Sequence, residues 1–268
     1  MDKIPCSVEI LTLNSAQTLS RCLESVRAFD DIIILDGNST DDTMKIAEYY
    51  GARVYPQAKT DKKNVRIENF AEVRNQGLAL AKYAWFLFID SDEYLSPEAA
   101  EEIRGIVARG KSNTHFLYQL PRVYTFNGAP VASLKPIYQL RFFYIPAATP
   151  FVKRVHERVK PKAGYALGAL KHPEIVPLED IKTLRQKWVH YLDIEQDKMK
   201  DITFARFVRS ARANIKKFLK YLIKALLNKI FHPRTSLPLV YDLSNAAYHL
   251  QIIWRLAVNL WRNILKHN

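Results

Sequence analysis

The stretch Trp85-Phe86-Leu87-Phe88-Ile89-Asp90-Ser91-Asp92-Glu93 decides the fold class of this chain. Its first five residues are apolar, and the run then stops at a group of three carboxylates. A second run of this kind, Ile32-Ile33-Ile34-Leu35, stops at Asp36-Gly37. Short apolar runs that end in polar loops are typical of strands buried in a parallel sheet.

Helical patterns alternate with these runs along the first hundred residues. Further strands are expected at Val8–Leu13 and Ala52–Tyr55, and helices at Ala16–Phe29, Thr40–Tyr50 and Glu68–Tyr83. This rhythm predicts an α/β fold with a doubly wound, mostly parallel sheet.

The rest of the first two hundred residues has a different texture. Ser96 and Pro97 are expected to cap and open another helix. Aromatic and β-branched residues predict strands at His115–Phe126 and Ile137–Tyr144. The prolines at 161, 173 and 177 indicate loops over residues 160–189.

Length and composition fit one large domain, or a catalytic domain with an appendage. The chain has 268 residues, of which 48% are hydrophobic, so it can bury a sizeable core. Cys6 and Cys22 form no disulfide framework and no zinc-binding spacing, which favours a reducing compartment. The chain shows no secretory signal and no apolar stretch long enough to span a membrane, and we expect a cytoplasmic location.

The net charge of +13 is unevenly placed. From Lys198 onward there are 14 basic and two acidic residues, so this tail carries +12 of the total. We therefore expect a catalytic domain over residues 1–194 and a basic, amphipathic helical region over residues 195–268, with a break near His232-Pro233 and Pro238.

The tail has two interpretations. Apolar residues at three- and four-residue steps, with lysine, arginine and two tryptophans between them, are typical of helices on an anionic membrane surface. This predicts a protein peripheral to the inner face of the cytoplasmic membrane. The alternative is a helical pair packed on the catalytic domain. No nucleic-acid-binding motif accompanies the charge, so no nucleic acid is expected.

Ligands of open α/β sheets bind beyond the carboxyl ends of the strands. Asp36 and Asp90 each follow a predicted strand and should reach the same edge of the sheet. Crowded carboxylates at that edge favour a hard divalent cation such as Mg²⁺ or Mn²⁺, which bridges protein oxygens to a diphosphate. The alternative is an acidic, solvated turn.

Four motifs resemble the family 2 glycosyltransferases of the GT-A fold. They are Thr12-Leu13-Asn14, Asp36-Gly37-x-Ser39-x-Asp41-x-Thr43, Arg74-Asn75-x-Gly77 and Asp90-x-Asp92-Glu93. A looser series is similar to the bacterial lipopolysaccharide-core β-glucosyltransferase branch, namely Arg141-Phe142-Phe143, Val155-His156-Glu157 and His190-Tyr191.

The resemblance implies roles for the residues of the first four motifs. Asp36 would bind the nucleotide base, with Thr12 and Asn14 lining the same site. Asp90 would face the ribose, and Asp92 would hold the metal on the diphosphate. Arg74 would support the nucleotide site, unless it is a surface helix residue.

The later motifs supply candidates for the acceptor chemistry. We expect Glu157 to act as general base, taking the proton of the acceptor hydroxyl. Glu93 is the rival for this role, and Glu157 could instead pair with Arg154 or Arg158. His190 is a candidate metal ligand or else a core histidine, and His156 has the same ambiguity.

The resemblance therefore implies an inverting glycosyltransferase. It would move a sugar from a nucleotide diphosphate, expected to be UDP, to a glycan or glycolipid acceptor, as in lipopolysaccharide assembly. Two alternatives stay open: a polyprenyl-phosphate sugar synthase, and a non-catalytic membrane-binding protein on a transferase-like fold.

Overall fold

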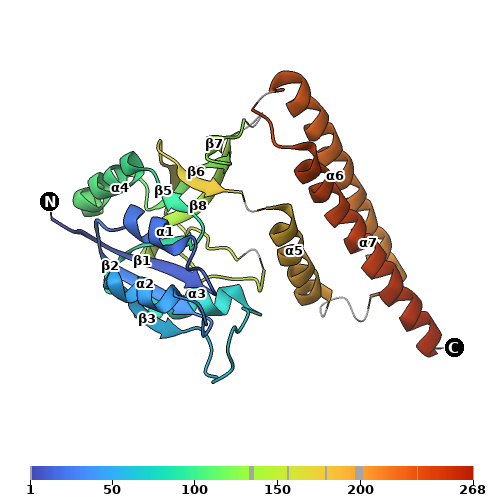
Figure 1. Cartoon of the computed structure of the whole chain (residues 1–268), viewed down its shortest axis with the longest axis horizontal. Coiled ribbons are helices and arrows are strands. Elements are labelled where there is room, and N and C mark those ends of the chain that lie inside the picture. Colours follow the sequence, from blue (N-terminus) through green and yellow to red (C-terminus); the bar gives the residue numbers. More distant parts are fainter. Residues whose placement is uncertain are drawn as a thin grey trace. The chain divides into compact units, whose positions relative to one another are not determined.

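The computed structural model describes residues 2–132, 136–155, 157–178, 180–196, 202–233 and 235–267. The chain divides into two compact units. Unit 1 comprises Met1–Thr125 and Pro136–Pro177, and unit 2 comprises Phe126–Lys135 and Leu178–Asn268. Figure 1 shows the sheet of unit 1 and the long helices of unit 2.

Unit 1 is built on a twisted mixed sheet. Its strands run in the order β3-β2-β1-β4-β8-β6-β10-β5, and β9 pairs with β6 outside this path. The strands are β1 (Ile4–Thr12), β2 (Phe29–Asp36), β3 (Arg53–Pro56), β4 (Trp85–Asp90), β5 (Tyr94–Leu95), β6 (Leu117–Phe126), β8 (Ile137–Tyr144), β9 (Leu167–Ala169) and β10 (Glu174–Pro177).

The first four strands of the path, β3, β2, β1 and β4, are parallel to one another. Their register places Thr12 opposite Asp36 and Leu11 opposite Asp90. The two acids predicted to reach one edge of the sheet therefore do so. Beyond β4 the sheet continues through β8, which is antiparallel to both β4 and β6.

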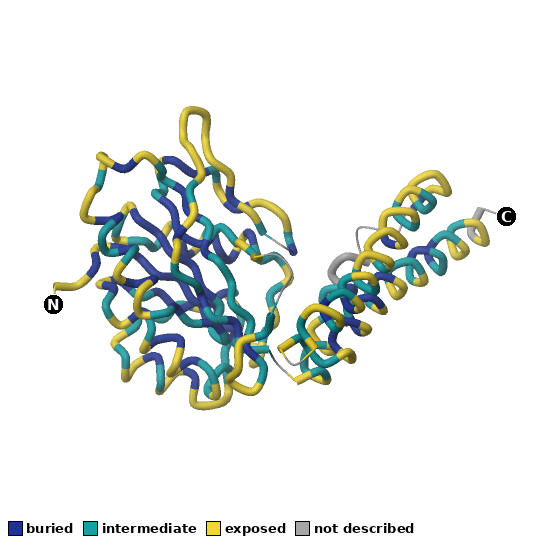
Figure 2. Tube along the Cα trace, turned by 90° about the horizontal axis from the view of Figure 1, so that it is seen from above, coloured by how far each residue is buried: buried dark blue, intermediate teal, exposed yellow. Residues whose placement is uncertain are grey.

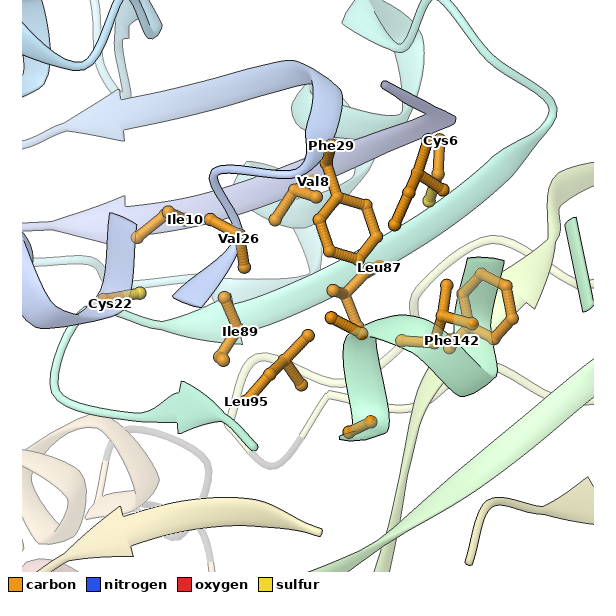
Figure 3. Packing of buried hydrophobic residues seen from close by; sticks show 14 of the residues in the cluster. Cys6, Val8, Ile10, Cys22, Val26, Phe29, Leu87, Ile89, Leu95 and Phe142 are labelled. Atoms are coloured by element: carbon orange, nitrogen blue, oxygen red, sulfur yellow. The ribbon is translucent and has the colours of Figure 1, made fainter. Parts of the chain in front are cut away.

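Helices cover both faces of the parallel strands. The helices of unit 1 are α1 (Leu19–Ser25), α2 (Thr43–Tyr49), α3 (Phe70–Leu80) and α4 (Pro97–Arg109). Along β1, the side chains of Cys6, Val8 and Ile10 enter the core under α1 and α4, as Figure 3 shows in part. Leu11 points to the opposite face and packs with Val73 of α3. The expected α/β class, a doubly wound and mostly parallel sheet with a helical C-terminal appendage, is confirmed.

Both cysteines lie in this core. Cys6 and Cys22 are free thiols with almost no exposed surface. Burial raises the pKa of each thiol well above its ordinary value, because the thiolate would lose its hydration there. They act as small apolar side chains that fill space beneath α1.

The predicted elements of unit 1 exist, with shorter helices than expected. The predicted Ala16–Phe29 helix is only Leu19–Ser25, because residues 16–18 form a turn instead. The cap at Ser96 is confirmed, since its hydroxyl accepts a hydrogen bond from the backbone N–H of Ala99 at 3.2 Å, and Pro97 opens α4. The expectation of loops over residues 160–189 was wrong in part, because β9, β10 and the start of a helix lie there.

Unit 2 is mainly helical. It contains α5 (Ile181–Gln196), α6 (Phe204–Phe231) and α7 (Leu239–His267), and also the short β7 (Ala129–Pro130). The predicted break near His232-Pro233 and Pro238 separates α6 from α7. The predicted boundary between residues 194 and 195 falls inside α5, which packs against α7.

Figure 2 shows exposed residues along much of the two long helices. Within the described residues, no helix combines the length and the apolar character needed to cross a bilayer.

Candidate functional site

Asp36, the last residue of β2, shapes the loop that follows its strand. The hydroxyl of Thr12 donates to Asp36 Oδ1 at 2.7 Å, and the hydroxyl of Ser39 donates to the same oxygen at 2.6 Å. The backbone N–H of Ser39 donates to Asp36 Oδ2 at 2.8 Å. Three donors occupy most of the acceptor positions of this buried carboxylate. Thr12 and Asp36, both predicted to line the nucleotide site, are thus in direct contact.

Three asparagines with left-handed backbone join the loops at this edge. Asn14, Asn38 and Asn64 have φ values of 51°, 57° and 55°, a conformation that asparagine tolerates better than most residues. The amide of Asn14 donates to Asn64 Oδ1 at 3.0 Å, and the N–H of Thr40 donates to Asn14 Oδ1 at 2.9 Å. The predicted site residue Asn14 therefore connects the loop after β1 with two later loops.

Gly37 allows the segment around Val65 to approach this loop closely. The N–H of Val65 donates to the carbonyl of Gly37 at 2.7 Å. A Cβ atom at Gly37 would lie 2.5 Å from both the Val65 carbonyl oxygen and Gln57 Nε2. Only glycine fits here, so the loop geometry around Asp36 depends on it.

Asp90, at the carboxyl end of β4, is held by two buried arginines. Arg74 Nη2 lies 2.5 Å from Asp90 Oδ1, and Arg141 Nη2 lies 3.0 Å from Asp90 Oδ2. Both arginine side chains are 1% exposed, whereas that of Asp90 is 42% exposed. Burial by itself raises the pKa of Asp90, but Arg141 and Arg74 outweigh it and hold the pKa well below its ordinary value.

The aromatic ring of Phe88, a residue of β4, lies beneath the guanidinium groups of both arginines. The guanidinium carbons of Arg74 and Arg141 lie 4.9 and 5.0 Å from its ring centre. This distance allows a cation–π interaction with each arginine. One aromatic residue of the core thus helps to fix the two cations that hold Asp90.

Glu93 belongs to the buried side of this cluster. Its carboxylate contacts Arg141 Nη2 at 2.5 Å and also accepts from Arg122 Nη2. Arg122 and Arg141 in turn contact Glu174 of β10 at 2.7 and 3.3 Å. Burial raises the pKa of Glu93 well above its ordinary value, with Arg141 partly opposing that effect. Glu93 is only 4% exposed, so its place is among the arginines.

Glu9 completes the cluster on the other side of Arg74. It lies in the middle of β1 with no exposed surface, and Arg74 Nη1 is 3.2 Å from Glu9 Oε2. Burial raises the pKa of Glu9 to about 8, although Arg74 lowers it. Raised pKa values at Glu9 and Glu93 favour the neutral forms of these two acids. The cluster contains three arginines and five acids, namely Arg74, Arg122 and Arg141 with Glu9, Asp90, Glu93, Glu157 and Glu174. With two of the acids neutral, the cluster comes closer to electroneutrality.

Asp92 lies in the turn that follows β4, and its side chain is half-buried. The neighbouring Ser91 hydroxyl is 2.9 Å from the hydroxyl of Ser15, which follows β1. The acidic turn is therefore tied to the same loops as Asp36.

The donors present fit a metal shared with a diphosphate. Among the residues that the structure describes, no group of three or more His, Cys, Asp or Glu side chains could hold a metal. Mg²⁺ bound to a diphosphate usually needs only one or two protein carboxylates. Asp92 is the predicted source of one, and both oxygens of Asp90 contact arginines.

Glu157 is brought to the same cluster from far along the chain. Its Oε1 lies 3.3 Å from Arg74 Nε, and its side chain is 15% exposed. Arg74 is thus not a surface residue, and it contacts both Asp90 and the predicted base. Among the described residues, Glu157 forms its ion pair with Arg74 rather than with the neighbouring Arg154 or Arg158 considered from sequence.

Neither histidine candidate belongs to the described residues of unit 1. His190 lies on α5 in unit 2, next to Tyr191, with its ring centre 6.2 Å from that of the tyrosine. His156 lies outside the described residues. Both assignments stay predictions.

Comparison with known proteins shows what the first part of the chain resembles. Residues 7–127 match the family model described as glycosyl transferase family 2. This part of the chain is similar to the family 2 glycosyltransferases. The matched range contains Thr12, Asn14, Asp36, Arg74, Asp90 and Asp92.

Curated relatives match part of this chain. An uncharacterised glycosyltransferase of Rickettsia felis is 38% identical over 121 residues, which are 45% of this chain and 39% of the relative. A PGL/p-HBAD biosynthesis glycosyltransferase of Mycobacterium bovis is 32% identical over 97 residues, covering 33% and 36%. The chain thus spans less than half the length of these relatives. A glucosyl-3-phosphoglycerate synthase of Mycobacterium tuberculosis, solved with Mn²⁺ and UDP-glucose, is 25% identical over 46% of this chain and 44% of its own, with a TM-score of 0.34.

Sequence reasoning missed several members of the cluster in unit 1. Glu9, Arg122 and Glu174 were given no role, and Arg141 was noted only as part of a motif. Glu9 carried a usable signal, because an acid inside an apolar strand needs a buried partner. Arg122 and Glu174 carried none, since they meet only through the pairing of β6 with β10.

Proposed function

We propose that this protein is an inverting, metal-dependent glycosyltransferase that uses a UDP-sugar as donor. One observation carries the proposal: Asp90 stands half-exposed at the end of β4, fixed by two buried arginines, beside Asp92 and the Asp36 loop. Carboxylates held at the carboxyl ends of parallel strands suit a nucleotide diphosphate and its counter-ion. The relationship to family 2 glycosyltransferases supports the same reading.

The residues of the domain divide the work of donor binding. Asp36, Thr12 and Asn14 shape the loops that would receive the base, and Asp90 would accept from the ribose hydroxyls. Asp92 would hold a Mg²⁺ or Mn²⁺ ion against the diphosphate. When bound, that ion neutralises the charge that grows on the leaving phosphate. Arg74 and Arg141 keep Asp90 ionised and in place.

Glu157 is the proposed general base. In a single displacement, the acceptor oxygen forms a bond to the anomeric carbon as the bond from that carbon to the phosphate oxygen breaks. The acceptor proton passes to Glu157, and UDP leaves with the electron pair of the broken bond. Glu157 is more exposed than Glu93, whose carboxylate is enclosed by Arg122 and Arg141. The contact with Arg74 would orient Glu157 at the donor.

We further propose a glycan acceptor that is lipid-linked, as in lipopolysaccharide or other cell-surface glycan assembly, at the inner face of the cytoplasmic membrane. The basic charge of the tail supports this location. A transferase that acts on such an acceptor must reach the lipid surface, because the acceptor cannot leave it.

A ligand panel tests the donor assignment. Thermal unfolding would be followed with UDP-glucose, UDP-galactose and GDP-mannose, each with and without Mn²⁺. A UDP-sugar at 100 times its dissociation constant should add about 2.7 kcal/mol to the free energy of unfolding, and only with the metal. Equal stabilisation by GDP-mannose would overturn the UDP assignment. If no nucleotide sugar binds or is hydrolysed with metal present, the proposed activity is wrong.

A further inference from the structure

The two long helices of unit 2 form an antiparallel hairpin whose inner seam is rich in polar residues. α6 and α7 lie side by side along their length (Figure 1). Asn214 and Asn228 of α6 and His249 of α7 are buried there. His249 Nδ1 lies 3.0 Å from Asn214 Oδ1, and its ring stacks on that of Tyr221 with 5.4 Å between centres. Polar contacts therefore help to join the helices.

The outer side of α6 carries an aliphatic stripe. The residues between 46% and 62% exposed on this stripe are Ile215, Leu219, Ile223, Leu226 and Ile230. They follow one another at steps of three and four residues, and at about 100° per residue such positions share one side of a helix. The buried Asn214 and Asn228 occupy another side.

α7 repeats this arrangement with aromatic residues. Its apolar residues that are between 46% and 67% exposed are Leu239, Leu243, Leu250, Trp254, Trp261, Ile264 and Leu265. These positions again share one side of the helix. His249 and Leu256, which are buried, lie on the side that faces the other helices.

The hairpin thus buries polar groups and exposes large apolar ones along two helices. In water this distribution is unfavourable, because each exposed Leu, Ile or Trp keeps apolar surface hydrated. Contiguous apolar surfaces of this kind on soluble proteins mark binding sites for another protein or for a membrane. Small and polar residues between helices, with apolar residues outside, are also the distribution of helices packed in lipid.

The basic charges next to the stripe indicate which kind of partner this surface binds. Lys216, Lys217 and Lys220 are exposed on α6, and Lys216 and Lys220 lie on the side of the helix adjoining the aliphatic stripe. A second copy of the chain would bring two such basic regions together, each in a tail with +12 net charge. An anionic lipid surface instead attracts them, and it accepts apolar and tryptophan side chains at its headgroup boundary.

We propose that α6 and α7 form a membrane-docking surface that lies in the plane of an anionic bilayer. The stripes of Ile215–Ile230 and Leu239–Leu265 enter the headgroup boundary, and the lysines of α6 contact lipid phosphates. The surface consists of these two helices alone, so the inference deepens the proposed membrane location, on which it rests, and does not depend on the donor chemistry.

Vesicle flotation of the full chain tests this surface. The protein should float with vesicles of phosphatidylcholine mixed with phosphatidylglycerol and should bind pure phosphatidylcholine much less. High salt should weaken binding, since screening shortens to about 3 Å at 1 M. Brominated lipids should quench tryptophan fluorescence, and Trp254→Phe with Trp261→Phe should remove most of that quenching.

Two triple variants separate the apolar and the charged contributions. Leu219→Ser, Ile223→Ser and Leu226→Ser remove part of the stripe, and Lys216→Glu, Lys217→Glu and Lys220→Glu reverse the charge. Each set should lower the partition coefficient at least about tenfold. For the charge set, the reason is that a single lysine near an anionic surface already raises the partition coefficient several-fold. The matched control is Lys82→Glu, Lys111→Glu and Lys171→Glu, three exposed lysines of unit 1, which should bind as the wild type does. Circular dichroism verifies that each variant keeps its helices.

Several results would overturn the inference. One is a wild-type chain that stays unbound on anionic vesicles at low salt. Another is a concentration-dependent dimer that the stripe variant abolishes, without flotation, which would make a second copy the partner. A third is loss of donor hydrolysis together with flotation in the charge variant. A chain that floats but binds no UDP-sugar would refute the proposed function and leave this surface intact.

Discussion

Arg74 reaches Asp90 with an Nη2–Oδ1 distance of 2.5 Å, so that a fully buried cation fixes a half-exposed carboxylate at the end of a strand. The same guanidinium also contacts Glu9 and Glu157. One side chain therefore connects the middle of β1, the end of β4 and the predicted base. Arg74 therefore forms ion pairs with three carboxylates and fixes the position of each.

Replacing Arg74 should cost far more stability than replacing a surface arginine. Arg74→Met leaves buried carboxylates without their counter-charge, and loss of one partner of a buried pair costs about 3–5 kcal/mol. The matched control is Arg27→Met, whose pair with Glu24 is 72% and 56% exposed and should contribute at most about 1 kcal/mol. Urea unfolding of both variants measures the difference. Equal losses would show that the buried network adds no stability.

Asp92→Asn should abolish transfer while leaving the fold intact. The amide keeps the shape of the side chain and removes its negative charge, so it removes a metal ligand with little change in packing. The turnover should fall at least about 100-fold, with the thermal midpoint almost unchanged. Glu48→Gln, an exposed acid on α2, serves as control. A variant that keeps wild-type activity and metal dependence would remove Asp92 from the metal site.

Much of the sheet edge that carries Asp36 and Asp90 was predictable from sequence, because it depends on local patterns. The apolar runs before Asp36 and Asp90 identify buried strands, and parallel strands bring their carboxyl ends together. Nothing local shows that Asp36 is enclosed by Thr12 and Ser39. That enclosure follows from the register of β1 with β2 and from the turn after Asp36.

The part of the cluster formed by Arg122, Arg141 and Glu174 could not be predicted from the sequence, for a physical reason. Arg122, Arg141 and Glu174 lie on β6, β8 and β10, and they meet because β8 inserts between β4 and β6. Such non-local pairing leaves no periodic signal along the chain. Similarly, Pro173 and Pro177 favoured loops in the sequence analysis, so the start of α5 at Ile181 was not predicted. Asp180 accepts hydrogen bonds from the first turn of this helix.

Glu157→Gln should separate catalysis from donor binding. A general base acts on the acceptor proton, so turnover should fall by roughly 10²–10⁴-fold, while donor affinity barely changes. Glu93→Gln should instead lower stability, because that carboxylate lies between Arg122 and Arg141. The reverse pattern would make Glu93 the base. Full activity of Glu157→Gln on a polyprenyl phosphate would favour the synthase, whose acceptor needs less help from a base.

Glu9 should make stability depend on pH above the acid range. Its folded-state pKa is about 8, against an ordinary value of 4.5, so the folded chain binds a proton that the unfolded chain has lost. This group therefore favours folding at low pH, and its contribution declines as pH rises from about 4.5 to about 8. Glu9→Gln cannot titrate, so the free energy of unfolding should decline less steeply in the variant than in the wild type across that window. Thermal midpoints at a series of pH values test this, with Glu48→Gln as control. Parallel curves for wild type and Glu9→Gln would contradict the raised pKa.

Two helical glycines should respond to alanine in opposite directions. A Cβ atom at Gly77 of α3 would collide with the carboxylate of Glu9, whereas at Gly105 of α4 the nearest contact is Arg109 Nη1 at 3.6 Å. Gly105→Ala should stabilise the chain by roughly 0.5–1 kcal/mol, because alanine loses less backbone entropy in a helix. Gly77→Ala must displace Glu9 from Arg74 or move α3 off the sheet, so it should destabilise the chain by at least about 1–3 kcal/mol. Because Arg74 also holds Asp90 and Glu157, the same variant should lose transferase activity at temperatures where it is still folded. Stabilisation by both alanines would mean that α3 does not pack on Glu9 as closely as the structure shows.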